Sequence, residues 1–184
     1  MKSNIILSVL LQVFILWTAT SQTTWLPDSS QVTFYIKNAG FRVEGSFEGL
    51  EADIRFDPSH LEDASISASI TAATIDTGIK LRDKHLRKSD YFDVERYPMI
   101  TMSSRAFRKK GNEYEADFLL SLKGVEREVI MPFSFQNERK KGQFEGTLRI
   151  DRRDYEVGGK SLMLSDDVEI QIWVQVKRGD VERN

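Results

Sequence analysis

The sequence predicts an all-β domain whose antiparallel strands close into a barrel. Apolar and polar residues alternate with a period of two through most of the chain, which is the pattern of strands with one buried face. Turn-forming residues interrupt the alternation at KKGN (109–112), KGVE (123–126) and RKKG (139–142). The sequence shows no clear pattern of a long amphipathic helix. These observations favour eight or nine antiparallel strands with short connections, in a sandwich or an up-and-down barrel.

The start of the chain has the features of a secretory signal peptide. A basic residue is followed by an apolar run at 5–17 and then by small residues. The apolar run is shorter than the roughly 20 residues that cross a bilayer, which disfavours a retained membrane anchor. We therefore expect cleavage near Ser21/Gln22, with residues 1–21 as the signal peptide. The remainder, 22–184, is expected to form a single periplasmic or secreted domain.

Strand positions follow from the alternation itself. Val32, Phe34 and Ile36 fall on one face of the first stretch, with other residues between them. The same period predicts further strands at 41–47, 52–56, 66–72, 100–104, 114–122, 128–135, 144–150 and 168–176. A barrel is favoured over a sandwich because closure removes exposed strand edges and gives the apolar faces a common interior. The sequence has no cysteine, so packing and strand closure must stabilise the domain.

An outer-membrane barrel is an alternative, since its strands show similar alternation with the apolar face toward lipid. Most apolar stretches here are too short to span a bilayer, and matching aromatic girdles are absent. The chain also ends in KRGDVERN rather than in an aromatic strand. We therefore expect a barrel without stable membrane insertion.

Small residues stand among large aromatic ones on the inward face, which leaves room for a central apolar cavity. Gly45 and Ala72, for example, share this face with several phenylalanines. The predicted lining residues are assigned by their parity on the strands. They are Phe34, Ile36, Val43, Phe47, Ile54, Ala68, Ile70, Phe118, Leu120, Met131, Phe133, Leu148, Ile170 and Ile172.

One segment, DTGIKLRDKHLRKSDYFD at 76–93, breaks the alternation with a dense mixture of charges. We expect a short loop or helix near 80–95 that crosses one end of the barrel. It is either a solvated loop, in which Arg82 pairs with Asp83 or Asp76, or a rim at the barrel mouth. In a rim, a planar guanidinium is suited to holding a phosphate or other polar head group. The rim candidates are Arg82, Asp83, His85 and Phe92.

Catalytic and metal-binding patterns are weak. His60 and His85 are the two histidines and no cysteine supports them, so we expect no metal site. Among 28 acidic residues, no spacing singles out a carboxylate pair for glycoside hydrolysis, and the common catalytic motifs are absent. A net charge of −2 disfavours general nucleic-acid binding. We predict a binding protein rather than an enzyme. The alternatives are a secreted hydrolase and a structural or stress-related module with a filled interior.

Five longer motifs follow one another in a specific order: SSQVTF, VEGSFEGLEADIRFDP, IDTGIKLRDKHLRKSDYFDVERYPMI, LSLKGVEREVIMPF and IDRRDYEVGG. With these motifs the chain resembles the YceI-like family of polyisoprenoid-binding proteins over nearly all of its predicted mature length. The positions that carry the resemblance most specifically are Thr77, Gly78, Arg82, Asp83, Leu86, Phe92, Tyr97 and Pro98.

The resemblance implies an eight-stranded, lipocalin-like antiparallel barrel that is exported to the periplasm. It implies a long isoprenoid lipid, of the quinone or polyprenyl phosphate type, bound in the central pore as a ligand. No cofactor and no catalysis are implied, and we expect a monomer or homodimer. Two positions depart from the family pattern. Ser29 stands where the family often has a His, and Glu156 stands where a Gly usually follows the aromatic residue, so a different backbone turn is expected there.

Overall fold

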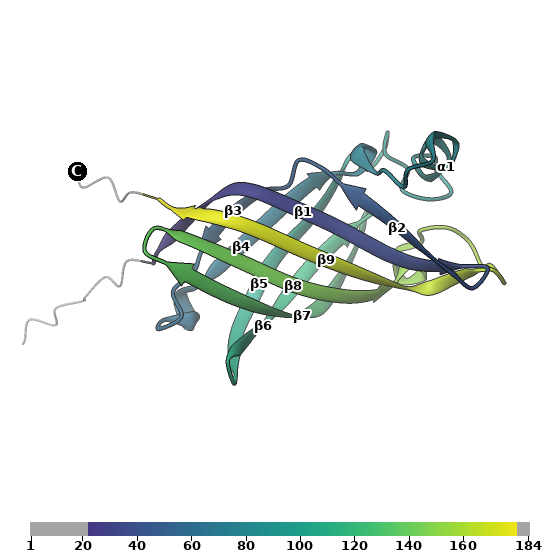
Figure 1. Ribbon diagram of the computed structural model, residues 1–184. Helices are drawn as coiled ribbons and strands as arrows, with labels where there is room; N and C mark the ends of the chain where they lie inside the picture. The colour runs from purple at the N-terminus through teal and green to yellow at the C-terminus, as the bar shows by residue number, and fades with distance from the viewer. Residues whose placement is uncertain (1–21, 180–184) are drawn as a thin grey trace, which may run out of the picture.

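The computed structural model describes residues 22–179, so the predicted signal peptide lies outside the described residues. Within that range the chain forms one antiparallel sheet, a short helix and three 3₁₀ turns (Figure 1). The strands are β1 (Thr24–Asn38), β2 (Phe41–Phe47), β3 (Glu51–Arg55), β4 (Ser65–Thr71), β5 (Met99–Lys110), β6 (Glu113–Leu122), β7 (Val125–Glu138), β8 (Lys141–Asp151) and β9 (Leu164–Arg178). The helix α1 spans Lys80–Leu86, and the 3₁₀ turns span Leu61–Asp63, Ala72–Thr74 and Arg152–Tyr155.

The sheet closes because β1 pairs with strands on both of its edges. On one edge it pairs with β9 from Trp25, opposite Arg178, to Asn38, opposite Leu164. On the other edge its second half pairs with β2 and its first two residues pair with β3. β2 and β3 therefore share one place beside β1, and the closed ring runs through β1, β3 and β4 to β9. The predicted eight-stranded antiparallel barrel is confirmed, and the sandwich alternative is wrong.

Several strands are longer than the alternation predicts, and two of them, β5 and β1, extend past a bulge that changes the parity of their residues. The alternation predicts a strand at 100–104, but β5 continues to Lys110. Its pairing with β6 shifts register between Ser104 and Ala106, and a bulge moves the following side chains to the other face. β1 likewise begins well before Val32, ahead of a register shift in its pairing with β9. A period of two cannot be followed through such an extra residue.

The end of the barrel far from α1 is filled by a cluster of aromatic rings, which we call the aromatic floor. Phe56 lies at its centre with 0% of its surface exposed. Five rings surround Phe56 at centroid distances of 5.2–5.8 Å: Phe107, Tyr114, Phe133, Phe135 and Phe144. The indole nitrogen of Trp25 donates a hydrogen bond of 2.9 Å to the carbonyl oxygen of Phe56. The floor therefore closes the interior at the end from which β1 starts and β9 leaves (Figure 1).

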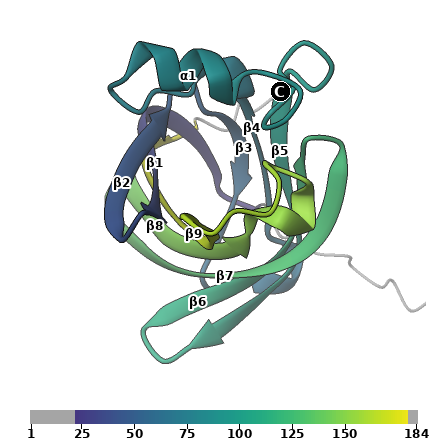
Figure 2. The same ribbon diagram turned by 90° about the vertical axis from the view of Figure 1, so that its right-hand side faces the viewer.

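The other end of the barrel, which we call the mouth, is partly covered by α1 and the irregular residues after it. Figure 2 shows α1 lying across the top of this end, with the chain before β9 on the opposite side. The helix forms within the charged segment predicted as a loop or helix near 80–95. Within residues 22–179, no helix has the length and apolar character needed to cross a membrane.

Candidate ligand-binding cavity

The barrel interior holds a cavity of about 240 Å³ between the aromatic floor and α1. Its lining side chains are apolar almost throughout, and they come from all nine strands. All fourteen residues that strand parity predicts as lining belong to this wall, from Phe34 on β1 to Ile172 on β9. Phe133 and Phe144 belong to both the cavity wall and the aromatic floor, so the cavity ends on the floor. Contact between these residues and a ligand stays a prediction.

Sequence reasoning missed two groups of lining residues. The first group has the inward parity of the predicted strands and could have been found by extending the list: Val32, Ala52, Ile66, Ile100, Met102, Leu122, Phe144, Gly146, Ile150, Val168 and Val174. The second group comes from the mouth and from turns: Leu50, Ile75, Thr77, Leu86, Tyr91 and Val157. These segments have no strand period, so no alternation pointed to the second group.

The predicted rim residues divide between the cavity and the outside. Arg82 and Phe92 line the cavity, whereas Asp83 and His85 do not. The ring of Phe92 packs against Phe47 at a centroid distance of 5.7 Å, which fastens the irregular segment to the wall. The ring of His85 packs edge-on against Tyr91 at 5.1 Å and borders a shallow outer hollow instead. Asp83 and His85 therefore lie on α1 at the mouth without lining the cavity, and a contact of either with a head group stays a prediction.

The side chain of Asp83 has a structural role, because it folds back from α1 and contacts Thr77, which lies before the helix. It is 5% exposed, and its Oδ1 accepts hydrogen bonds from the backbone nitrogen and the hydroxyl of Thr77, at 2.9 and 2.5 Å. A buried carboxylate is stable when its oxygens are hydrogen-bonded in this way. The contact fixes the chain that enters the helix. The burial of Asp83 follows from this role, which the charge pattern alone could not reveal.

Arg82 also binds Thr77 but keeps part of its guanidinium uncommitted. Its Nε donates to the Thr77 hydroxyl and its Nη2 to the Thr77 carbonyl oxygen, both at 2.7 Å. Arg82 and Asp83 thus meet at Thr77 rather than at each other, and Arg82 makes no ion pair with Asp76 among the described residues. Within the same range the Arg82 Nη1 has no hydrogen-bond partner. Arg82 therefore lines the cavity with one donor group, Nη1, that is available to a ligand at the mouth.

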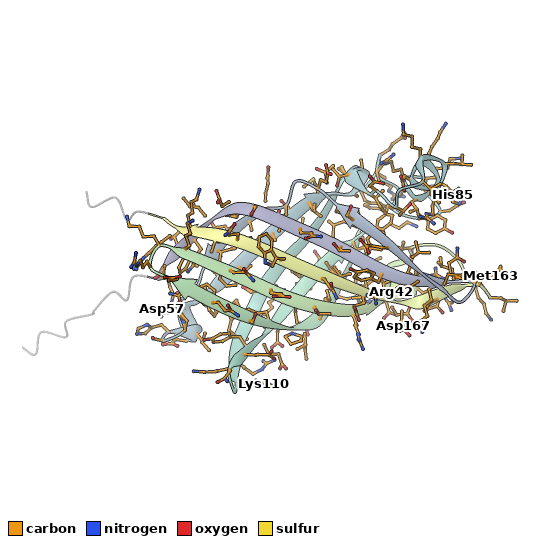
Figure 3. The ribbon with its side chains drawn as sticks, in the orientation of Figure 1. Arg42, Asp57, His85, Lys110, Met163 and Asp167 are labelled. Carbon is orange, nitrogen blue, oxygen red and sulfur yellow. The ribbon has the colours of Figure 1, made fainter. Side chains whose placement is uncertain are left out.

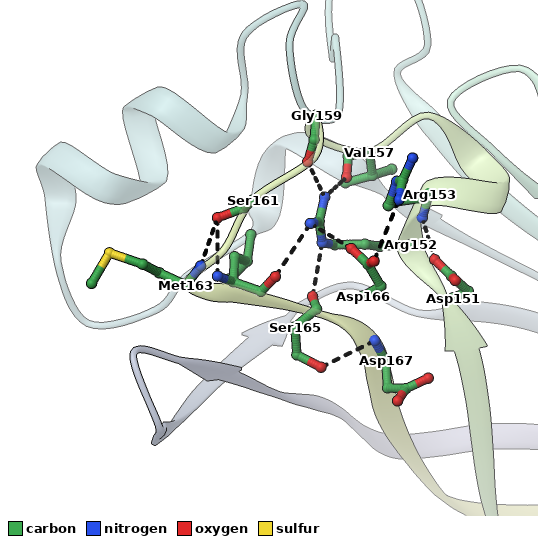
Figure 4. Close-up of polar contacts among 11 residues, drawn as sticks. Asp151, Arg152, Arg153, Val157, Gly159, Ser161, Met163, Ser165, Asp166 and Asp167 are labelled. Carbon is green, nitrogen blue, oxygen red and sulfur yellow. Dashed lines mark hydrogen bonds and ion pairs between the residues drawn. The ribbon is translucent and has the colours of Figure 1, made fainter.

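A second arginine, Arg152, also lines the cavity, but all of its donors are engaged (Figure 4). It is 3% exposed, and its Nε donates to the carbonyl oxygen of Ser165 at 2.9 Å. Nη1 donates to the carbonyl oxygens of Val157 and Gly159, at 2.8 and 3.1 Å. Nη2 donates to the carbonyl oxygen of Leu164 at 3.4 Å and to the Asp166 carboxylate at 2.8 Å. All five N–H donors are used, so Arg152 holds the loop before β9 rather than a ligand.

The same loop places a glycine where a side chain would not fit. Gly158 has φ 71°, and a Cβ built there would lie 2.8 Å from the ring of Tyr91 and 3.0 Å from Nη1 of Arg152. The backbone nitrogen of Gly158 also donates to the carbonyl oxygen of Asp90 at 2.8 Å. The loop before β9 is thereby joined to the segment after α1, so the two sides of the mouth are connected.

The two departures from the family pattern have different consequences. Glu156 adopts φ 56°, the left-handed conformation that glycine reaches without steric cost, so the glutamate is accommodated in a turn that a glycine could also make. The hydroxyl of Ser29 donates to the side chain of Gln175 at 3.3 Å, far from the mouth. Ser29 also adjoins the register shift between β1 and β9.

Acid–base groups are scarce around the cavity. None of the described residues that line it is Asp or Glu. Near Arg152, burial raises the pKa of Tyr155 to about 12, so its phenol stays protonated at neutral pH. Among residues 22–179, no group of three or more His, Cys, Asp or Glu side chains is placed to hold a metal ion. The lining of the cavity therefore offers apolar contact and a few hydrogen-bond donors.

Known proteins share this sequence pattern. The chain matches the YceI-like domain family over residues 24–176. A UPF0312 protein of Photorhabdus laumondii is 30% identical over 131 residues, which cover 67% of this chain and 68% of that protein. Protein YceI of Salmonella arizonae is 26% identical over 151 residues, which cover 78% and 79% of the two chains.

Solved structures share the fold. BcnA of Burkholderia cenocepacia has a TM-score of 0.76 at 28% identity, covering 79% of this chain and 95% of that chain. A polyisoprenoid-binding domain from Saccharophagus degradans, implicated in plant cell wall breakdown, has a TM-score of 0.66 at 13% identity. At that identity the likeness concerns the fold. Because the family match runs from β1 to β9 and the barrel agrees with it, the chain belongs to the YceI-like family.

Proposed function

We propose that this protein holds one long isoprenoid lipid, of the quinone or polyprenyl phosphate type, inside its barrel. The observation that carries the proposal is the apolar cavity, closed by the aromatic floor at one end and bordered by Arg82 at the other. The lipid tail would lie along the barrel axis and the head group would stay at the mouth. We further propose that the protein acts after export and removal of residues 1–21, and that it binds its ligand without changing it.

The size and polarity of the cavity support a slender, apolar ligand. Burial contributes about 0.8 kcal/mol for each methylene group, and the cost of ordering the tail is subtracted from this gain, so affinity should rise with the length of tail that the cavity buries. The cavity volume of about 240 Å³ is below the roughly 300–1,000 Å³ that small-molecule sites commonly have. A single extended chain suits this interior better than a bulky fused-ring molecule does.

The alternative functions have less support. A hydrolase that uses two carboxylates needs them to face the substrate, and no Asp or Glu side chain among the described residues lines the cavity. A purely structural module needs no interior space, yet the barrel contains a cavity beyond its packed floor. The solved neighbour from Saccharophagus degradans, named a polyisoprenoid-binding domain, supports the same class of ligand.

Native mass spectrometry tests the proposal directly. The protein is incubated with polyprenyl phosphates and quinones of increasing tail length, and bound mass is measured. We expect one lipid for each protein chain, with affinity rising with tail length until the cavity is filled. A short-chain alkyl phosphate serves as the control for the head group alone. Absence of any stoichiometric complex with the long-tailed lipids would exclude the proposed function.

Narrowing the cavity should change which tail lengths are accepted. Ala68 lines the wall on β4, and Ala68→Phe places a ring in the space that the tail would occupy. We expect the longest accepted isoprenoid to become shorter while the barrel stays folded, because a ring in an open cavity displaces ligand before it displaces strands. Ser67→Phe is the matched control, since Ser67 is exposed on the same strand. Equal losses for short and long tails would contradict a ligand that extends along the barrel.

Removing the cation at the mouth should affect charged ligands most. Arg82→Gln should weaken binding of a polyprenyl phosphate by about 1.5–3 kcal/mol relative to a quinone with the same tail, because the phosphate loses a charge-assisted hydrogen bond. Paired titrations with the two ligands measure the difference. Lys84→Gln is the matched control, because it removes the same charge from α1 at an exposed position that does not line the cavity. This control should leave the difference between the two ligands unchanged.

The hydrogen bonds from Arg82 to Thr77 define the opposing result. If Arg82 serves to hold the mouth segment in place, both ligands should weaken together and the melting temperature should fall. A thermal melt of Arg82→Gln, recorded beside the titrations, therefore separates the two roles. Parallel losses with a lower melting temperature would rule out a head-group contact.

A further inference from the structure

The mouth of the barrel carries a concentration of exposed apolar side chains. They come from three separate segments: the turn between β1 and β2, helix α1 with its preceding residue, and the loop before β9. The side chains are Phe41, Ile79, Leu81, Leu162 and Met163, with exposures of 76%, 53%, 80%, 101% and 64%. Large apolar residues are rarely left so exposed in a group unless a partner covers them.

The fold brings these segments to one end. The backbone nitrogen of Ala39 in the β1–β2 turn donates to the carbonyl oxygen of Met163 at 2.8 Å, so the two loops form one projecting edge. Figure 3 shows Met163 and His85 of α1 at the same end of the barrel, with Asp57 at the opposite end and Lys110 at the tip of the hairpin between β5 and β6. The cavity reaches between the two sides of this end, where Asn38 and Arg82 line it.

Basic side chains accompany the apolar ones. Lys80 and Lys84 are one helical turn apart on the exposed side of α1, next to Leu81, and Lys88 follows the helix. Lys160 precedes Leu162 in the other segment. None of these four lysines forms an ion pair with a described residue.

The acidic residues near α1 lie mostly outside the helix, with Asp76 before it and Asp90 and Asp93 after it. The Asp83 carboxylate is buried and bound to Thr77, and the Asp76 carboxylate accepts a hydrogen bond from the backbone of Gly78 at 2.7 Å. Asp90 is exposed. Helix α1 itself carries three basic residues, Lys80, Arg82 and Lys84, against one acidic residue, the buried Asp83, and it exposes Leu81, whereas the chain as a whole has a net charge of −2.

We propose that the mouth docks on the surface of a bilayer that contains anionic phospholipids. Exposed leucine and methionine side chains beside lysines are the combination that enters a lipid interface, the apolar groups reaching the acyl boundary and the ammonium groups the phosphates. Docking in this pose places the cavity opening against the membrane, where a water-insoluble ligand could enter without crossing water. This purpose rests on the proposed lipid-binding function, but the docking surface itself is argued from the exposed residues.

Vesicle flotation tests the docking surface without any ligand for the cavity. The chain beginning at Gln22 is used, because the closed barrel lies wholly within residues 22–179. Vesicles of phosphatidylcholine alone are compared with vesicles that also contain phosphatidylglycerol. We expect binding to the anionic vesicles, weakening with added salt because surface charges are screened.

Two pairs of variants make the test specific to the mouth. The double variant Leu81→Ser and Leu162→Ser should bind anionic vesicles about tenfold more weakly or worse, because it loses two apolar side chains that would enter the lipid interface. Leu26→Ser with Ile130→Ser is the matched control, because these exposed residues lie on the outer wall away from the mouth. A circular dichroism melt shows that each variant is folded.

The charge contribution is tested in the same way. Lys80→Gln with Lys84→Gln should also weaken binding to anionic vesicles by about tenfold, since each lysine near the surface contributes to the attraction. Lys109→Gln with Lys141→Gln removes the same net charge at exposed positions on β5 and β8 and should change little.

Three results would overturn the docking surface. These are no binding to anionic vesicles, equal losses in the mouth variants and their controls, and self-association in ultracentrifugation that Leu81→Ser with Leu162→Ser abolishes. The last result would assign the apolar edge to a second copy of the chain. Because the vesicles contain no polyisoprenoid, failure here leaves the cavity experiment unaffected, and failure of lipid binding in mass spectrometry leaves vesicle binding measurable.

Discussion

Arg152→Leu should lower the free energy of unfolding by about 3–5 kcal/mol, because the change leaves buried polar groups without partners. The guanidinium is 3% exposed and donates to four carbonyl oxygens and to Asp166. Leucine keeps much of the volume but donates no hydrogen bond. Urea unfolding of both proteins, followed by circular dichroism, measures the difference.

Arg153→Leu is the matched control for this prediction. The neighbouring arginine has a half-exposed side chain and approaches the same Asp166 at 3.6 Å. Surface ion pairs of this kind contribute about 0–1 kcal/mol, so a small change is expected. If Arg152→Leu proved as mild as Arg153→Leu, the loop before β9 would have to be held by something other than these hydrogen bonds.

Phe56→Ala should also destabilise the barrel by about 3–5 kcal/mol, because it empties the centre of the aromatic floor. Five rings contact Phe56 at centroid distances of 5.2–5.8 Å, and they cannot collapse fully into the space of a missing ring. Thermal and urea unfolding measure the loss. Phe41→Ala is the control, since Phe41 is 76% exposed and its removal should be nearly neutral.

The same substitution has a second expected result. Because the cavity ends on Phe133 and Phe144, which pack against Phe56, opening the floor should deepen the interior. If the barrel of Phe56→Ala remains folded at low temperature, it should accept a longer isoprenoid than the unchanged protein does. An unaltered length limit together with lower stability would show that the ligand does not reach the floor.

Most of the barrel could be predicted from the sequence, because apolar and polar residues alternate along a strand that has one buried face. Phe34 and Ile172 are far apart in the chain, yet parity places both on the cavity wall, where the structure has them. The length of β5 could not be predicted, because the register shift between Ser104 and Ala106 breaks the period.

The mouth was less predictable than the wall. Composition pointed to the charged segment and to Arg82, but a mixture of charges does not tell which side chains turn inward. Asp83 is buried through its contacts with Thr77, whereas His85 faces out. Arg152 was missed altogether, because its partners are mainly backbone carbonyl oxygens, which every residue possesses and no sequence pattern marks.

The pairing of β1 with β9, which closes the barrel, governs how this chain can fold. It joins Trp25 to Arg178 and continues to the other end of both strands, so the contacts that close the ring link the two ends of the domain. Folds dominated by such distant pairings are slow, since a long loop must be ordered before the contacts form. Until β9 is available, β1 and β8 each present an unpaired edge that can associate with other chains. A growing chain therefore stays open until its last strand arrives, and truncation before Leu164 should yield aggregation rather than a smaller barrel.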